Sequence, residues 1–139
     1  MIETVTGLPF NQLVGLQAGA APSLLTLPEG PQYLNHLGTV HASALLALAE
    51  ASSGEFLLQR LGQIGGFIPV VRRLEAKFRK PAHGAVTSQV STPEQALDDT
   101  RRDLAAKGRA LVSIAVELHD QSGTHVFSAE VDWFLAKAA

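Results

Sequence analysis

The sequence contains no cysteine, a modest number of charged residues and no apolar run long enough to cross a membrane. Without cysteine, the 139 residues cannot form disulfides, thiolate metal sites or cysteine nucleophiles. The densest apolar stretch, residues 37–49, is about 13 residues long, whereas a membrane-spanning helix needs roughly 20 apolar residues. Charged residues make up 17% of the chain, and 11 basic against 13 acidic residues leave a formal net charge of −2. This balance argues against nucleic acid or an anionic membrane surface as the main partner.

The start of the chain and its length give expectations about location and domain organisation. The opening Met-Ile-Glu-Thr places no basic region before an apolar one, so we expect no secretion signal. Together with the lack of cysteine, this predicts a cytoplasmic protein. The sequence contains no internal repeat, low-complexity segment or long linker, which predicts one domain over residues 1–139.

A long apolar helix is the strongest secondary-structure signal. Residues 39–61 are rich in Ala and Leu, with Thr39 as the predicted N-cap and Gly62 just past the end. Apolar residues lie nearly all round the first half of this helix, so we expect it to be buried. Residues 70–80 then alternate between apolar and charged side chains, which is typical of a strand with one wet face. Further elements are expected at residues 7–16, 23–27, 85–91, 94–107, 109–119 and 124–135.

The last part of the chain carries signals for a helix and a hairpin. The Thr-Pro-Glu-Gln sequence at residues 92–95 fits a capping box with proline at the first helical position. The Asp-Gln-Ser-Gly sequence at residues 120–123 is typical of a turn, so the strands around it should form an antiparallel hairpin. One long apolar helix with several strands predicts an α+β fold, in which a curved antiparallel sheet wraps around the helix. Such a sheet has exposed edges, and dimerisation is a common way to cover them.

Glu50 is the one carboxylate in the alanine- and leucine-rich stretch at residues 44–51 of the predicted buried helix. One interpretation is that its side chain points to solvent or caps a neighbouring backbone group, because glutamate is rarely fully buried. The other is a general base or nucleophile whose pKa is raised toward neutrality by desolvation. The start of the helix offers a complementary group, since free amides near His41 and Ala42 could bind the oxygen of a polarised carbonyl.

Geometry separates these two candidate groups within one chain. Ala42 and Glu50 lie about 12 Å apart along the helix axis, because each helical residue rises 1.5 Å. One chain therefore cannot easily bring both to one carbonyl. Two antiparallel copies of the helix in a dimer could, with Asn35 and the helix start of one subunit facing Glu50 of the other.

The same segment resembles the hotdog-fold acyl-CoA thioesterases, in particular the branch related to phenylacetyl-CoA and medium- to long-chain acyl-CoA thioesterases. Members carry Asn-x-x-Gly-Thr-x-His-(Gly/Ala)-(Gly/Ser)-Ala, followed on the same helix by Ala-Leu-Ala-(Asp/Glu). The Phe-Arg-Lys-Pro-Ala sequence at residues 78–82 is similar to the end of a strand in this family, and the resemblance covers about residues 20–135. The matching positions in the helix segment are Asn35, Gly38, Thr39, His41, Ala42 and Glu50.

The resemblance implies a fold, a reaction and roles for several residues. It implies a hotdog fold and hydrolysis of an acyl-CoA thioester without a separate cofactor, in a homodimer with shared active sites or a homotetramer. Glu50 would activate water or attack the thioester, and the amide of Ala42 would bind the oxyanion. Asn35 would position the water or the carbonyl, and His41 would help to shape the loop.

The sequence also departs from the family pattern. Ala42 and Ser43 replace a frequent Gly-Gly pair, and Glu50 replaces the Asp of one branch. Some relatives have a catalytic Ser or Thr on the strand after the helix, where this chain has Val71.

A basic turn formed by Arg79, Lys80 and His83 is the candidate site for the phosphates of coenzyme A, because arginine and lysine suit phosphate oxygens. The alternative is that these charged side chains are simply exposed to water at the end of a strand and bind nothing. His36 and His41 lack a third ligand nearby, so no metal site is predicted.

Other functions stay open as alternatives. The first is a non-catalytic acyl-CoA-binding or regulatory domain, in which Glu50 only satisfies a polar group. A hydratase acting on enoyl thioesters is disfavoured, because Asp120 and His125 lie on either side of a hairpin turn. A serine hydrolase is not supported, since no Gly-x-Ser-x-Gly sequence occurs.

Overall fold

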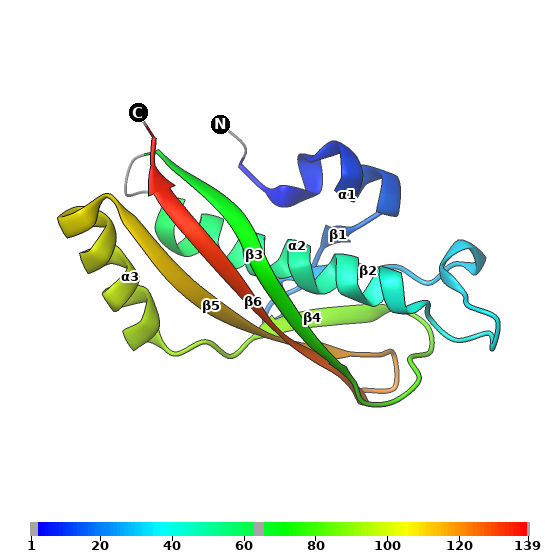
Figure 1. Ribbon diagram of the computed structural model, residues 1–139. Coiled ribbons are helices and arrows are strands. Elements are labelled where there is room, and N and C mark those ends of the chain that lie inside the picture. Colours follow the sequence, from blue (N-terminus) through cyan, green and yellow to red (C-terminus); the bar gives the residue numbers. More distant parts are fainter. Residues whose placement is uncertain (1–2, 63–65, 139) are drawn as a thin grey trace.

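A six-stranded antiparallel sheet curves around one long helix in the computed structural model, which describes residues 3–62 and 66–138 (Figure 1). The strand order is β1-β2-β4-β5-β6-β3. Residues 1 and 2, on which part of the secretion-signal expectation depends, lie outside the described residues. The strands are β1 (Gln17–Ala18), β2 (Leu25–Leu27), β3 (Phe67–Phe78), β4 (Val86–Val90), β5 (Arg109–His119) and β6 (His125–Lys137). The helices are α1 (Pro9–Val14), α2 (Ala42–Leu61) and α3 (Glu94–Lys107), with short 3-10 helices η1 (Val5–Gly7) and η2 (Pro31–Tyr33).

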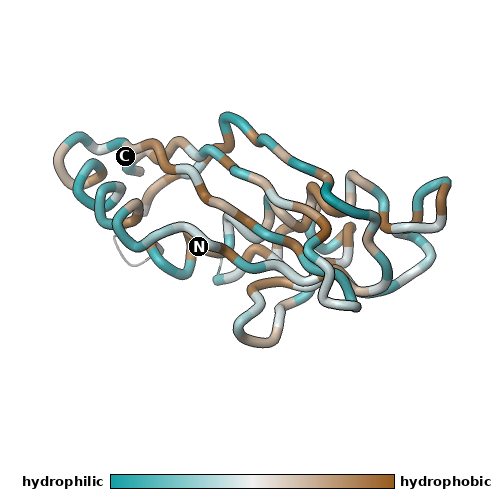
Figure 2. Tube along the Cα trace, turned by 90° about the horizontal axis from the view of Figure 1, so that it is seen from below, coloured by the Kyte–Doolittle hydropathy of each residue, from teal (hydrophilic) through white to brown (hydrophobic). Residues whose placement is uncertain are grey.

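The core lies between α2 and the concave face of the sheet. Hydrophobic and hydrophilic residues alternate along the long strands (Figure 2). In β5 every second residue from Ala110 to Leu118 is buried, and in β6 so are the odd positions from Phe127 to Leu135. These side chains pack with buried apolar residues of α2, as expected for a sheet with one face covered. The predicted buried helix and the predicted terminal hairpin are therefore confirmed. Within the described residues, no helix combines the length and apolar character that crossing a membrane requires.

The predicted N-cap of α2 was wrong by two residues. The helix begins at Ala42, and its N-cap is His41, whose Nδ1 accepts a hydrogen bond of 2.9 Å from the amide of Ser43. Thr39 stays in the preceding loop because its hydroxyl accepts a hydrogen bond of 2.9 Å from Asn35 Nδ2.

The predicted capping box of α3 was also wrong. The N-cap position is held by Pro93, and no side chain caps the helix. The hydroxyl of Thr92 instead accepts a hydrogen bond of 2.9 Å from the amide of Ala115 on β5. A partner from a distant strand has therefore replaced the local one that the spacing predicts.

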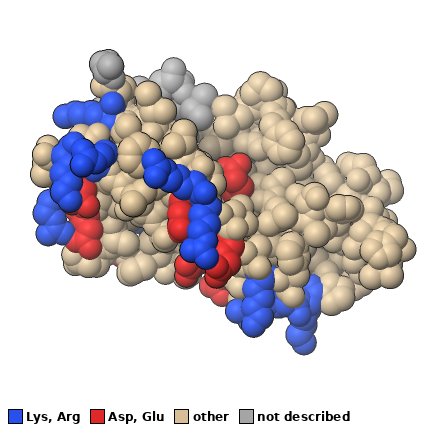
Figure 3. All heavy atoms as spheres, viewed as in Figure 1, with Lys and Arg blue, Asp and Glu red and all other residues tan. Residues whose placement is uncertain are grey.

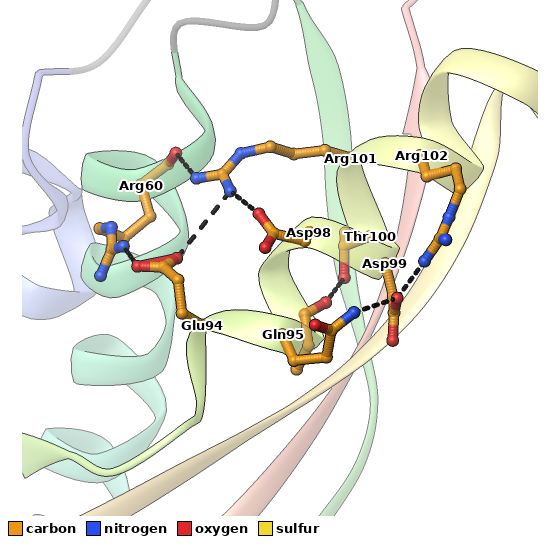
Figure 4. Close-up of polar contacts among 9 residues, drawn as sticks. Arg60, Glu94, Gln95, Asp98, Asp99, Thr100, Arg101 and Arg102 are labelled. Atoms are coloured by element: carbon orange, nitrogen blue, oxygen red, sulfur yellow. Dashed lines mark hydrogen bonds and ion pairs between the residues drawn. The ribbon is translucent and has the colours of Figure 1, made fainter.

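Helix α3 is fixed to the end of α2 by a polar cluster (Figure 4). Arg60, in the last turn of α2, pairs with Glu94 in the first turn of α3. Arg101 donates a hydrogen bond of 3.1 Å to the backbone carbonyl of Arg60 and one of 2.9 Å to Asp98. These exposed charges therefore tie the two helices together.

Strand β3 forms one edge of the sheet and pairs only with β6. The sequence predicts one buried and one wet face for this strand, but most of its side chains are exposed, including Ile68 at 56% and Phe78 at 50%. Leu74 and Ala76 pack against the core while the charged residues between and beside them are exposed, so the predicted alternation holds only in this part of the strand. A bulge between Val71 and Arg73 interrupts the register with β6.

Candidate active site

A cavity of about 380 Å³ lies along the second half of α2. Glu50, Gly54, Leu58 and Gly62 line it, and their spacing of four residues places them on one face of the helix. The other walls are formed by the N-terminal segment, through Val5, Leu8 and Asn11, by the first residues of β3 and by the side chain of Trp133. Apart from Glu50 and Asn11, the lining is made of apolar side chains, glycine and the indole of Trp133.

Glu50 is half-buried and lies in the wall of this cavity. Among the described residues, no hydrogen-bond donor contacts its carboxylate; the nearby hydroxyl of Ser53 binds the backbone carbonyl of Glu50 instead, at 2.7 Å. Desolvation by burial raises the pKa of Glu50 above its ordinary value of 4.5. The side chain is therefore an unpartnered carboxyl group next to an apolar space.

The indole of Trp133 is held in place beside Glu50. Its Nε1 donates a hydrogen bond of 2.9 Å to the hydroxyl of Ser53, which in turn donates to the carbonyl of Glu50. Because this bond satisfies its only polar atom, Trp133 presents an apolar ring to the cavity.

The loop before α2 is organised by Asn35. Its Oδ1 accepts hydrogen bonds from the amides of Leu37, at 2.9 Å, and Thr39, at 3.1 Å. Its Nδ2 donates to the hydroxyl of Thr39 at 2.9 Å. Gly38 has φ +76°, a conformation that favours glycine. The geometry thus gives Asn35 a clear part in shaping this loop.

The start of α2 presents a free donor. His41 accepts from Ser43 through its ring and from the amides of Ala44 and Leu45 through its carbonyl. In the described part of the chain, the amide of Ala42 has no hydrogen-bond partner, and Ala42 is exposed. An unpaired amide at a helix N-terminus is suited to bind a negatively charged oxygen.

The structure brings some of the predicted site residues together and keeps others apart. The amide of Val40 donates a hydrogen bond of 2.9 Å to the carbonyl of Ala82, so the loop of Asn35 lies beside the basic turn. His83 lines a groove there with Gly38 and Val40. Glu50 lines a different cavity, further along α2. Within one chain, Glu50 therefore lies apart from the other predicted site residues.

The other basic residues lie where β3 ends. Arg79 donates a hydrogen bond of 3.1 Å to the hydroxyl of Ser128. Figure 3 shows basic side chains gathered at this end of β3. Lys80 and Pro81 lead from there to the loop of Asn35. Nowhere in the described ranges do three or more His, Asp or Glu side chains gather closely enough to hold a metal ion.

Sequence reasoning missed Glu55, Asn11 and Gly54. Glu55 is buried and accepts hydrogen bonds from the amide of Val5 at 2.9 Å, the hydroxyl of Thr4 at 3.1 Å and Gln59 at 2.9 Å. Asn11 donates to the carbonyl of Val5 at 2.9 Å. These bonds hold the N-terminal segment over the cavity. A second carboxylate in the same apolar helix was the available signal for Glu55.

These features place the chain among the proteins with a hotdog fold, in which a curved antiparallel sheet wraps around one long helix. A Pseudomonas aeruginosa protein of unknown function, described as a probable thioesterase, matches with a TM-score of 0.82 at 26% sequence identity, over 96% of this chain and 91% of that one. A thioesterase family protein from Silicibacter pomeroyi matches with a TM-score of 0.68 at 15% identity, over 94% and 91% of the two chains. A Bacillus halodurans protein crystallised with CoA matches with a TM-score of 0.62 at 20% identity, over 80% and 65%. The predicted α+β hotdog fold is confirmed.

The chain belongs to the DUF4442 family, described as a domain of unknown function, which matches residues 12–135. No curated protein matches the chain. The solved structures confirm the predicted resemblance to the hotdog thioesterase superfamily.

Proposed function

We propose that this protein is an acyl-CoA thioesterase, which hydrolyses an acyl-CoA thioester to a free acid and coenzyme A. The observation that carries the proposal is the unpartnered carboxyl group of Glu50 in the wall of an apolar cavity. The Pseudomonas aeruginosa protein described as a probable thioesterase and the Bacillus halodurans protein crystallised with CoA support it. The reaction requires no separate cofactor, and we expect it to take place in the cytoplasm.

In the proposed reaction, Glu50 acts as the general base. Its carboxylate takes a proton from water while the water oxygen forms a bond to the thioester carbonyl carbon. The amide of Ala42 donates a hydrogen bond to the carbonyl oxygen as that oxygen becomes negatively charged. When the carbon–sulfur bond breaks, the proton held by Glu50 passes to the departing thiolate. Asn35 and His41 act by holding the loop and the helix start that present the Ala42 amide.

The proposed active site is shared between two subunits. Glu50 of one subunit would face Ala42 of the partner subunit, because within one chain the two residues are about 12 Å apart along α2. The exposed edge strand β3 supports a dimer, since a long edge with apolar side chains is a template for pairing with a second copy. Phe67 and Pro69 of this strand line the Glu50 cavity. A tetramer would be built from such dimers.

The proposed phosphate site lies on the same subunit as the proposed oxyanion donor. The turn with Arg79, Lys80 and His83 adjoins the loop before α2 through the bond between Val40 and Ala82. One subunit would therefore hold the nucleotide part of coenzyme A and polarise the carbonyl. The other would supply Glu50.

Two substitutions test the roles of Glu50 and Ala42 without a large change in structure. Glu50→Gln removes the base and keeps the side-chain volume. Ala42→Pro replaces the amide proton with a ring carbon and keeps the backbone conformation, because proline suits the first position of a helix and His41 already has the extended conformation, φ −62° and ψ 140°, that proline requires before it. Each variant is expected to lower kcat by at least about 100-fold in an assay of free-thiol release over a panel of acyl-CoA substrates.

A heterodimer of the two variants tests the shared site. Co-expression with two different tags would allow the dimer with one Glu50→Gln and one Ala42→Pro subunit to be purified. If each site uses both subunits, this dimer has one intact site and one doubly altered site, and it should recover about half of the wild-type activity. An inactive heterodimer would show that Glu50 and Ala42 act within one chain or not at all.

The same assays decide between hydrolysis and binding alone. If Glu50→Gln kept most of the thiol release, the proposed mechanism would be wrong. If acyl-CoA bound in calorimetry but no thiol appeared with the wild-type protein, the chain would be a non-catalytic acyl-CoA-binding domain. Loss of enoyl absorbance without thiol release would identify a hydratase.

A further inference from the structure

We infer that the cavity along the second half of α2 binds an apolar acyl group of medium length, and that Gly54 determines how long that group can be. This inference builds on the proposed function, because it specifies the substrate of the same site. The residues that line the cavity belong to the same chain as Glu50.

The dimensions and lining of the cavity define the acyl group. Its volume of about 380 Å³ is room for roughly a dozen carbon-sized atoms, since a water molecule of similar size takes about 30 Å³ in the liquid. Glu50 lies toward one end of the lining stripe of α2 and Gly62 at the other. A thioester carbonyl placed at Glu50 would therefore send its acyl chain along the helix toward Gly62. An acyl group of about eight to twelve carbons fits this space.

The chemistry of the lining excludes charged acyl groups. Lys, Arg and His are absent from the cavity walls formed by the described residues. The indole N–H of Trp133 is already used by Ser53. An acyl group with a carboxylate at its far end would be desolvated near Gly62 without a hydrogen-bonding or charged partner. The cavity therefore favours plain aliphatic or aromatic acyl groups.

Gly54 is placed where a side chain would narrow the cavity. It lies in the interior of α2, one turn after Glu50, where glycine is less favourable than alanine. Its φ lies outside the positive range, so the backbone does not require glycine at this position. A Cβ atom there would lie 3.6 Å from the ring of Trp133 and 3.6 Å from Val5 Cγ1, which is ordinary contact. Alanine would therefore fit, and a larger side chain would occupy the space between Trp133 and Val5.

Trp133 provides a direct measure of occupancy, because it is the only tryptophan in the chain and lines the cavity. The probes are S-decyl coenzyme A and S-ethyl coenzyme A, thioethers that cannot be hydrolysed. We expect S-decyl coenzyme A to change the fluorescence of Trp133 in a saturable way. S-ethyl coenzyme A should bind at least about tenfold more weakly, because it buries eight fewer methylene groups.

The variants Gly54→Leu and Gly54→Ala test the part played by this residue. Gly54→Leu should weaken binding of S-decyl coenzyme A at least about tenfold and leave S-ethyl coenzyme A within about twofold. In thiol-release assays with saturated acyl-CoA substrates of 2 to about 16 carbons, it should move the optimum of kcat/KM to shorter chains. Gly54→Ala should have the same effect to a smaller degree, and it keeps the test valid if leucine disturbs folding. Ala106→Leu, on the exposed face of α3, is the matched control and should change neither profile.

The outcomes separate this inference from the proposed function. Thiol release with a chain-length profile that Gly54→Leu does not change would overturn the inference and leave the thioesterase proposal intact. A Trp133 signal that depends on Gly54, without thiol release from any substrate, would overturn the thioesterase proposal and keep the cavity assignment. Equal turnover of octanoyl-CoA and its ω-carboxylated counterpart would contradict the proposed apolar specificity.

Discussion

Glu50 and Glu55 lie five residues apart in α2, yet their carboxylates differ in their hydrogen-bond partners. Glu55 accepts three hydrogen bonds and fixes the N-terminal segment to the helix. The Glu50 carboxylate lines the cavity without a hydrogen-bond partner among the described residues. A partnered buried carboxylate stabilises the fold, whereas a desolvated one without partners is available for proton transfer. The partners of each side chain therefore separate a structural glutamate from a candidate catalytic one.

The raised pKa of Glu50 predicts how Glu50→Gln changes stability with pH. Because the folded state holds this proton more tightly than the unfolded state, the wild-type protein loses stability as the pH rises through the raised pKa. Glutamine has no charge to desolvate. The melting temperature of Glu50→Gln, relative to wild type, should therefore be higher at pH 7 than at pH 4. A difference that is the same at both pH values would contradict this, and Glu130→Gln, at an exposed position, serves as the control.

The residue scale also shows the limit of what the sequence could predict. Glu50 could be singled out because a charge in an apolar helix is visible in the sequence itself. Its difference from Glu55 could not be predicted, because Thr4 and Val5, the residues that satisfy Glu55, lie about fifty positions earlier. The role inferred for Gly54 depends likewise on Trp133 and Val5, which only the fold brings near it.

At the scale of elements, the N-terminal segment depends on few contacts for its position over the cavity. Glu55→Ala would leave the buried amide of Val5 without an acceptor, which should lower the free energy of unfolding by about 1–3 kcal/mol. Hydrogen exchange at residues 4–8 should become faster, and KM for medium-chain substrates should rise more than kcat falls. Glu94→Ala, which removes an exposed ion pair with Arg60, is the control and should cost less than about 1 kcal/mol. Unchanged exchange at residues 4–8 in Glu55→Ala would contradict this role.

The bounds of the elements were easier to predict than their caps. Helix α3 and strands β4 to β6 follow from local patterns of apolar residues and turns, and the structure has them within two residues of the predicted ends. The capping box failed because the hydroxyl of Thr92 binds the amide of Ala115, more than twenty residues later. Hydrogen-bond partners that are distant in sequence cannot be deduced from spacing alone.

At the scale of the whole molecule, the exposed edge strand β3 predicts how the protein assembles. Val70→Lys would place a charge on this apolar edge, which should prevent pairing with a second copy. We expect a folded monomer in light scattering, with thiol release lowered at least about tenfold because the proposed site needs two subunits. Ala106→Lys, on the exposed face of α3, should leave the assembly unchanged. A Val70→Lys protein that remains a fully active dimer would place the interface elsewhere.

The N-terminal segment also bears on how such proteins could diversify. Val5, Leu8 and Asn11 cover the cavity, yet they lie outside the curved sheet and far in sequence from the loop at residues 35–42. Natural selection acting on this short segment can therefore alter which substrates are accepted while the reacting groups stay as they are. Among relatives, the residues of this segment that line the cavity should accordingly vary more than the start of the long helix does.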